Sequence, residues 1–214
     1  MRAAALAAAV LLAGGCGGGG DDAGNGGETT ASGCRVVERP EPREPGPQQA
    51  PDTTLDPGAT TRAVVLTNCG DFTITLDPQA SPNAATSFTE LAEDGYFDET
   101  IFHRIVPGFV IQGGDPTATG MGGPGYTTVD TPDSGTQYTQ GVVAMAKAGN
   151  EPRGAAGSQF FVVTAEAVPL PPDYAVIGTV TDGLDVVERI GALGNEQEQP
   201  TETVLVERVE IERG

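Results

Sequence analysis

The sequence predicts a mainly β fold, a β-barrel closed at its ends by two helices. Three observations lead to this prediction. From Thr61 onward, short apolar runs alternate with breaks at Gly and Pro, a pattern typical of many short strands. Only two stretches carry apolar residues at helical spacing. Closing the sheet into a barrel would remove most of the exposed edges that so many short strands leave.

The domain begins with a predicted hairpin. Residues 63–67 and 71–76 are rich in β-branched residues, and the second run alternates between apolar and polar positions. Residues 68–71, Asn-Cys-Gly-Asp, supply the turn between them. Further short apolar runs predict the remaining strands, at 100–104, 109–112, 141–146, 159–164, 174–180 and 203–209.

Two amphipathic helices are predicted among these strands. The first opens at Ser81, with Pro82 at the first helical position, and closes at Gly95. Its apolar residues share one face, and they are Ala85, Phe88, Leu91 and Ala92. The second helix precedes the final strand and places Leu184, Val187 and Ile190 on one face.

The chain starts with a segment typical of export. Met1 and Arg2 precede an apolar run at 3–13, which is too short for a spanning helix of about 20 residues. Residues 12–16, Leu-Ala-Gly-Gly-Cys, resemble the lipobox of bacterial lipoproteins. That resemblance implies a lipoprotein signal peptide at 1–15, a lipid on Cys16, and an extracytoplasmic domain anchored to the cell membrane. An ordinary secretory signal is the alternative.

With Cys16 assigned to the lipid, an even pair of cysteines remains. Disulfides persist outside the cytoplasm, so we expect a bridge between Cys34 and Cys69; two unpaired thiols are the alternative. Between Cys16 and residue 60 the chain is rich in Gly and Pro and has little apolar periodicity. We expect a disordered tail there, an acidic linker at 16–60 that holds the domain at 61–214 away from a membrane.

The charge balance limits the partners of this protein. Thirty Asp and Glu against 11 Lys and Arg give a net charge of −19. Binding to nucleic acid depends on Lys and Arg neutralising phosphates, so we expect no nucleic-acid partner. One His and no Cys cluster offer little for a metal site, and we expect no metal and no cofactor. Strong self-repulsion favours a monomer.

Residues 102–115, Phe-His-Arg-Ile-Val-Pro-Gly-Phe-Val-Ile-Gln-Gly-Gly-Asp, resemble the signature of cyclophilin-type peptidyl-prolyl cis/trans isomerases. The resemblance continues through residues 120–123, 145–149 and 157–161. It implies the cyclophilin-like fold over residues 61–214, a closed eight-stranded antiparallel β-barrel capped by two α-helices. It also implies that the protein accelerates rotation about X-Pro bonds. The substrates would be proline-containing segments of exported proteins, whose folding it would assist.

Catalysing this rotation needs a hydrogen-bond donor for the amide nitrogen and a dry pocket for the proline ring. Arg104 fits the donor role because its guanidinium stays protonated, although a surface ion pair is the alternative. Gln112 can hold the substrate backbone, Phe109 matches the pocket, and His103 is expected as a pocket-lining donor. By resemblance, the remaining substrate-binding residues are Val110, Ala146, Lys147, Gln159, Phe161, Leu170 and Tyr174, with the backbone of Ala146 and Lys147 aligning the peptide.

The sequence leaves open the place of two aromatic residues and the class of function. Phe109 and Phe161 could equally be plain barrel core, the usual place of aromatic residues in strands. The same groove could also bind proline peptides without accelerating them, which would make the protein a peptide-binding module. A solute-binding or adhesive lipoprotein is a weaker alternative, because the sequence has no second lobe and no repeat.

Overall fold

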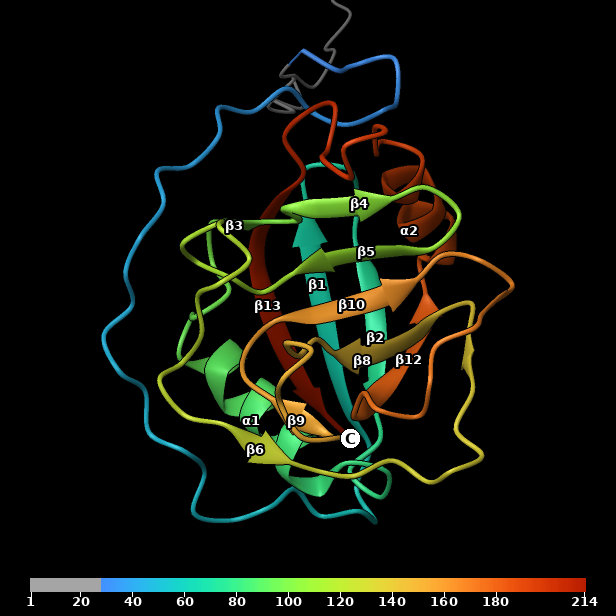
Figure 1. The fold of residues 1–214 in the computed structure, drawn as a ribbon. Helices are drawn as coiled ribbons and strands as arrows, with labels where there is room; N and C mark the ends of the chain where they lie inside the picture. Colours follow the sequence, from blue (N-terminus) through green and yellow to red (C-terminus); the bar gives the residue numbers. More distant parts are fainter. Residues whose placement is uncertain (1–27) are drawn as a thin grey trace, which may run out of the picture.

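The structure, a computed structural model, describes residues 28–214, which contain thirteen strands and two helices (Figure 1). The predicted signal peptide at 1–15, the predicted lipidation of Cys16 and the Gly-rich start of the linker lie outside the described residues. No helix within residues 28–214 is both long and apolar enough to span a membrane.

Nine strands form one antiparallel sheet in the order β3-β13-β1-β2-β12-β8-β10-β5-β4. In chain order these strands are β1 (Thr61–Thr67), β2 (Phe72–Leu76), β3 (Thr100–Ile101), β4 (Arg104–Val106), β5 (Val110–Gly113), β8 (Val142–Met145), β10 (Phe160–Val163), β12 (Val176–Asp182) and β13 (Leu205–Arg213). Two small ladders accompany the sheet: β6 (Thr128–Val129) pairs with β9 (Ala155–Ala156), and β7 (Tyr138–Thr139) pairs with β11 (Ala167–Val168).

The expected closed, eight-stranded barrel is borne out only in part, because the strands form one curled antiparallel sheet that is not shown as closed. The sheet is an open, strongly curled half-barrel that begins at β3 and ends at β4, with no ladder between these two strands in the described part of the chain. Only Phe102 and His103 separate β3 from β4, so one run of chain joins the two edges of the sheet. Within that run β3 pairs with β13 and β4 pairs with β5, and the two segments do not pair with each other.

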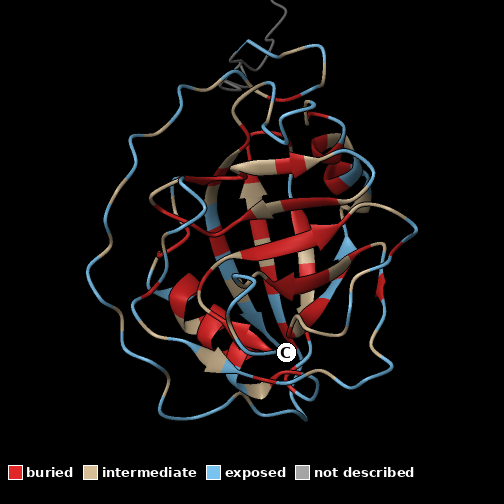
Figure 2. Cartoon of the chain, viewed as in Figure 1, coloured by how far each residue is buried: buried red, intermediate tan, exposed pale blue. Residues whose placement is uncertain are grey.

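Both predicted helices form, and they cover the curled sheet. α1 (Pro82–Glu93) has Pro82 in its first turn and buries Phe88 and Leu91, and α2 (Leu184–Gly191) buries Val187 and Ile190. Their apolar faces join the inward side chains of the sheet in one large core. Figure 2 shows the buried residues along the strands and over most of α1. The core makes the sheet a rigid support for the residues on its other face.

The predicted hairpin is confirmed, since β1 and β2 pair with Val65 opposite Phe72. Most predicted strands shift by one or two residues at their ends, and two differ more. The run at 100–104 is divided into β3 and β4, and the final strand runs from Leu205 to Arg213, further than the alternation at 203–209 indicates. The four two-residue strands of the small ladders were not predicted, because segments this short leave no periodic signal.

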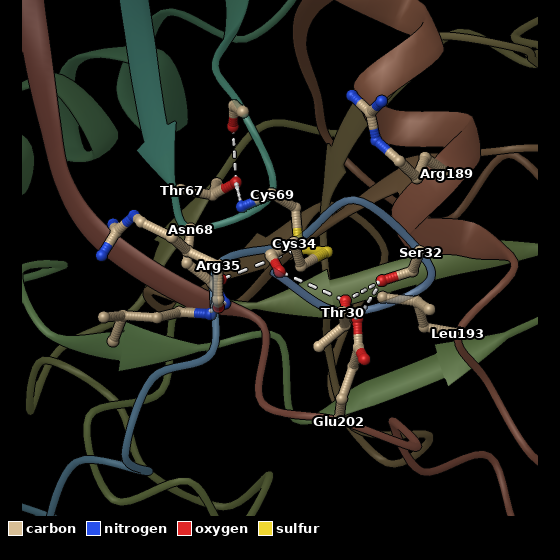
Figure 3. The surroundings of a disulfide bond; sticks show 12 residues. Thr30, Ser32, Cys34, Arg35, Thr67, Asn68, Cys69, Arg189, Leu193 and Glu202 are labelled. Atoms are coloured by element: carbon tan, nitrogen blue, oxygen red, sulfur yellow. Dashed lines mark hydrogen bonds between the residues drawn. A yellow bond between two sulfur atoms is a disulfide. The ribbon is translucent and has the colours of Figure 1, made fainter. Parts of the chain in front are cut away.

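The described part of the N-terminal segment, residues 28–60, follows a course fixed by contacts with the domain (Figure 1). Cys34 and Cys69 form the expected disulfide (Figure 3). Further along, one guanidinium nitrogen of Arg43 donates to the carbonyls of Tyr96 at 2.5 Å and Asp98 at 3.0 Å. Composition predicts a disordered linker at 16–60, and it does not reveal these specific contacts.

Candidate active site

The sheet has two faces because successive side chains in a strand point to opposite sides. On β4, β5 and β10 one set of side chains enters the main core, including Ile105, Ile111 and Phe160. The alternate set forms a second, smaller apolar cluster on the other face, including Val110 and Phe161. The candidate site is built on this second face.

Strand register brings three functional groups into one row on that face. Arg104 of β4 lies directly opposite Gln112 of β5, and Gln112 lies directly opposite Phe161 of β10. Opposed residues on neighbouring antiparallel strands have side chains in contact range. The register of β4, β5 and β10, which are neighbours in the sheet (Figure 1), therefore holds a cation, an amide and an aromatic ring side by side.

Hydrogen bonds connect the polar members of this row. Arg104 Nη1 donates to Gln112 Oε1 at 3.3 Å, and Gln112 Nε2 donates to Gln159 Oε1 at 3.0 Å. Gln159 Nε2 in turn donates to the carbonyl of Gly122 at 3.0 Å. The Arg104 Nε–H donates to a carboxylate oxygen of Glu198 at 2.7 Å. The ion pair that the sequence left as an alternative for Arg104 thus exists together with its place at the pocket.

A pocket of about 210 Å³ lies beside this row. Aromatic edges shape its wall, with the rings of Phe161 and Tyr174 at 5.5 Å in a T-shaped pair. The Tyr138 hydroxyl donates to the carbonyl of Tyr174 and fixes that segment. Every residue lining the pocket was predicted from the sequence: Arg104, Phe109, Val110, Gln112, Ala146, Lys147, Phe161, Leu170 and Tyr174. Phe109 and Phe161 belong to the second cluster, which places them at the pocket and outside the main core.

His103 does not line this pocket. Its ring packs near Gly120, and both ring nitrogens are buried without a hydrogen-bond partner in the described part of the chain. Burial is the largest influence on this ring and lowers the pKa of His103. The neighbour of a pocket-facing residue points elsewhere, because side chains alternate along extended chain. The expectation of a pocket-lining donor is therefore corrected.

The backbone amides of Ala146 and Lys147, which are expected to align the substrate, differ in their hydrogen bonding within the protein. The Ala146 amide already donates to the carbonyl of Gln159 at 2.8 Å, so it is occupied within the protein. For the Lys147 amide the structure records no such bond within residues 28–214. The Lys147 ammonium lies 5.6 Å from the centre of the Tyr174 ring and donates to two carbonyls, those of Ala148 and Glu151.

A second, larger hollow of about 490 Å³ adjoins the first. The two share Gln112, Ala146 and Lys147, so a bound peptide could occupy both. The sequence assigned four of its lining residues to the site, Gln112, Ala146, Lys147 and Gln159, but it did not predict the hollow itself. The Gly-rich run at 120–125 was the available signal, because it supplies much of the wall.

Comparison with known families places this site in context. The sequence model for "Cyclophilin type peptidyl-prolyl cis-trans isomerase/CLD" matches residues 62–211. The chain belongs to the cyclophilin family. The match starts within β1 and ends within β13, so it covers the whole main sheet and both helices.

Relatives of this cyclophilin are similar over nearly their full length. A "Peptidyl-prolyl cis-trans isomerase-like 1" of Gibberella zeae is 36% identical over 157 residues, which are 71% of this chain and 95% of the relative. The protein of the same name in Neurospora crassa is 37% identical over 158 residues, 72% of this chain and 95% of the relative.

Solved structures agree with the fold. A crystal structure of a Cryptosporidium parvum cyclophilin-type isomerase has a TM-score of 0.66 and 29% identity, covering 72% of this chain and 98% of that one. A crystal structure of that isomerase in the presence of the dipeptide Ala-Pro has a TM-score of 0.65 and 31% identity, covering 71% and 98%.

Proposed function

We propose that this cyclophilin accelerates cis/trans isomerisation of X-Pro bonds in exported polypeptides, outside the cytoplasm. One observation carries the catalytic part: the Arg104 guanidinium and the Gln112 amide lie at a pocket walled by Phe109, Phe161 and Leu170. Family membership supports the same reaction, and the curated relatives carry the isomerase name.

The reaction is rotation about an amide bond. Delocalisation of the nitrogen lone pair into the carbonyl sets a barrier of about 18 to 20 kcal/mol. The two ends of an X-Pro bond are nearly balanced, so uncatalysed exchange takes tens of seconds or longer. In the twisted transition state the lone pair is localised on the nitrogen. A catalyst must favour that twisted state over the planar one.

The residues of the pocket divide this task. The apolar walls hold the proline ring and exclude water, while Gln112 can bond the substrate backbone. A guanidinium N–H directed at the twisted amide forms a hydrogen bond that is stronger in the transition state than in the ground state. A gain of roughly 1.5 to 3 kcal/mol from such a bond corresponds to about 10- to 150-fold in rate. Orientation and desolvation supply the remainder.

The test is an NMR exchange assay on an Ala-Pro peptide. We expect the wild type to accelerate exchange, Arg104→Ala to lose at least about tenfold in kcat/KM, and Arg104→Lys to recover little because lysine lacks the rigid fork. Arg208→Ala is the matched control, since it removes another exposed Arg–Glu pair, on β13, that lines neither hollow. A wild type that binds the peptide without accelerating exchange would overturn the proposal and favour a peptide-binding module.

The location outside the cytoplasm rests on two supports. Residues 1–16 have the pattern of a lipoprotein signal, and the Cys34–Cys69 disulfide belongs to an oxidising compartment. Mass spectrometry of the mature protein from its native host should find Cys16 lipidated and first in the chain. An unmodified Cys16, or cleavage elsewhere, would remove the anchor. Light scattering of the soluble domain should give the mass of a monomer.

A further inference from the structure

The loop between α2 and β13 brings one acidic residue against the strand that carries Arg104. Glu198 uses both its side chain and its backbone there. Its carboxylate accepts from Arg104 Nε at 2.7 Å, and its carbonyl accepts from the amide of Ile105 at 2.9 Å. Two consecutive residues of β4 are thus bound by a single residue that is 94 positions away in the chain from Arg104.

The loop holds Glu198 in a conformation that must be imposed by its surroundings. Glu198 has a φ of 61°, in the left-handed region that is unfavourable for a non-glycine residue. Asn195 supplies the constraint. Its side-chain oxygen accepts from the amides of Gln197 at 2.9 Å and Gln199 at 3.0 Å, and its carbonyl accepts from the Glu198 amide at 3.0 Å.

A glycine allows this loop to approach β4 closely. A Cβ on Gly194 would lie 2.4 Å from the carbonyl oxygen of Ile105, which is too close for any side chain. The other end of the loop is fixed by Thr201, whose amide and hydroxyl both donate to the carbonyl of Leu193. The position of the Glu198 carboxylate is therefore built into the loop from both ends.

The fixed position of Glu198 determines the orientation of the Arg104 guanidinium. Glu198 binds Nε and Gln112 binds Nη1, so two partners on different strands and loops hold two of the three nitrogens. Because a guanidinium is flat and rigid, two such bonds fix its orientation. Nη2 has no recorded partner within residues 28–214, and it belongs to a side chain that lines the pocket.

We propose that Glu198 is a positioning residue for the isomerase reaction, holding the Arg104 guanidinium in the plane from which it meets the twisted prolyl amide. The proposal rests on the catalytic role proposed for Arg104. The proposal predicts that losing Glu198 changes the turnover rate and hardly changes the stability of the fold. The two side chains are 34% and 50% exposed, and ion pairs this exposed contribute little to folding, so the effect of losing Glu198 belongs mainly to kcat.

The first test compares three variants by NMR exchange kinetics on an Ala-Pro peptide. Glu198→Ala should lower kcat by roughly threefold to tenfold with KM changed by less than about twofold, because only the orientation of the donor is lost. Glu198→Gln should recover most of the rate, since its amide oxygen can still accept from Nε. Glu196→Ala, which removes the same charge from the same exposed loop, should behave as the wild type.

A second measurement identifies the cause. The Nε–H resonance of Arg104, assigned by its loss in Arg104→Lys, should exchange slowly with water in the wild type and in Glu198→Gln, and quickly in Glu198→Ala. Urea unfolding should show that all variants remain folded. A Glu198→Ala enzyme with the kcat of the wild type, or one with a lower kcat but an unchanged Nε–H signal, would overturn the proposal.

These outcomes are distinct from failure of the proposed function. If the wild type shows no acceleration, the isomerase function itself is wrong. If the wild type is active and Arg104→Ala is not, while Glu198→Ala keeps full activity, then Arg104 acts without help from Glu198 and only the positioning role is rejected.

Discussion

Phe160 and Phe161 are neighbours in β10 but serve different apolar clusters. The Phe160 ring meets three other rings in the main core, those of Phe88 at 5.3 Å, Phe97 at 5.9 Å and Phe102 at 6.0 Å. The Phe161 ring lies on the opposite face, where it packs against Tyr174 and lines the pocket. Composition cannot distinguish two adjacent phenylalanines, and only the strand period assigns them.

Substituting each ring should separate folding from function. Phe160→Ala should lower the free energy of unfolding by about 3 to 5 kcal/mol, because it leaves a cavity among packed rings. Phe161→Ala should cost less stability, since its space opens to the pocket, and should lower kcat/KM instead. Urea unfolding and the exchange assay measure the two effects. Full activity in Phe161→Ala would contradict its place in the site.

His103 predicts a pH dependence of stability. In the unfolded chain its pKa is about 6.5, whereas burial lowers the pKa of the folded ring. Below about pH 6.5 the unfolded chain therefore binds a proton that the folded chain does not, and stability decreases as the pH falls toward the folded pKa.

Because His103 is the only histidine, its effect can be isolated. Urea unfolding between about pH 5.5 and 7.5 should give a steeper loss of stability for the wild type than for His103→Gln. Equal slopes for the two proteins would mean that the folded ring titrates normally.

At the scale of elements, the conformation of the loop at 194–200 depends on the side chain of Asn195. Asn195 binds the amides of Gln197 and Gln199 and so supports the positive φ of Glu198. This loop was not predicted as functional, because nothing in its local sequence indicates that it contacts a strand far away in the chain. The helices and strands were easier to predict from the sequence. Pro82 marked the start of α1, and the apolar alternation marked β1 and β2.

Asn195→Ala should reproduce the Glu198→Ala defect without touching Arg104. Loss of the two side-chain bonds frees the loop, and we expect kcat to fall by roughly twofold to fivefold, a part of the effect of removing the carboxylate. The exchange assay measures it, with Gln197→Ala as the control in the same loop. An unchanged kcat would show that the loop keeps its shape without Asn195.

For the whole molecule, the disulfide joins the N-terminal segment to the domain. Cys34 and Cys69 are 35 positions apart, and Thr30 donates to Glu202 at 3.1 Å on the segment that leads into β13 (Figure 3). A bridge of this span restricts the unfolded chain.

The double substitution Cys34→Ala and Cys69→Ala should therefore lower the free energy of unfolding by about 3 to 4 kcal/mol. Urea denaturation of the oxidised wild type and the double variant measures the difference, with Cys16 removed from both proteins so that no free thiol complicates the comparison. Equal midpoints would show that the bridge contributes no stability.

The sequence predicted features that depend on residues close together in the chain, and it did not predict features that depend on contacts between distant residues. The pocket residues were found because a contiguous motif carries Arg104, Phe109 and Gln112 within nine positions of one another. How the two edges of the sheet meet was not predicted, because it is decided by the curl of the whole sheet. The contacts of Arg43 with the segment after α1 were missed for the same reason, since each joins residues about fifty positions apart.

The pocket lies on the outer face of the curled sheet, while the interior is filled by the main core. A polypeptide therefore needs no free end to engage it, and nothing has to be threaded through the molecule. A prolyl bond in the middle of a polypeptide can be rotated at the pocket while both flanking chains stay outside it.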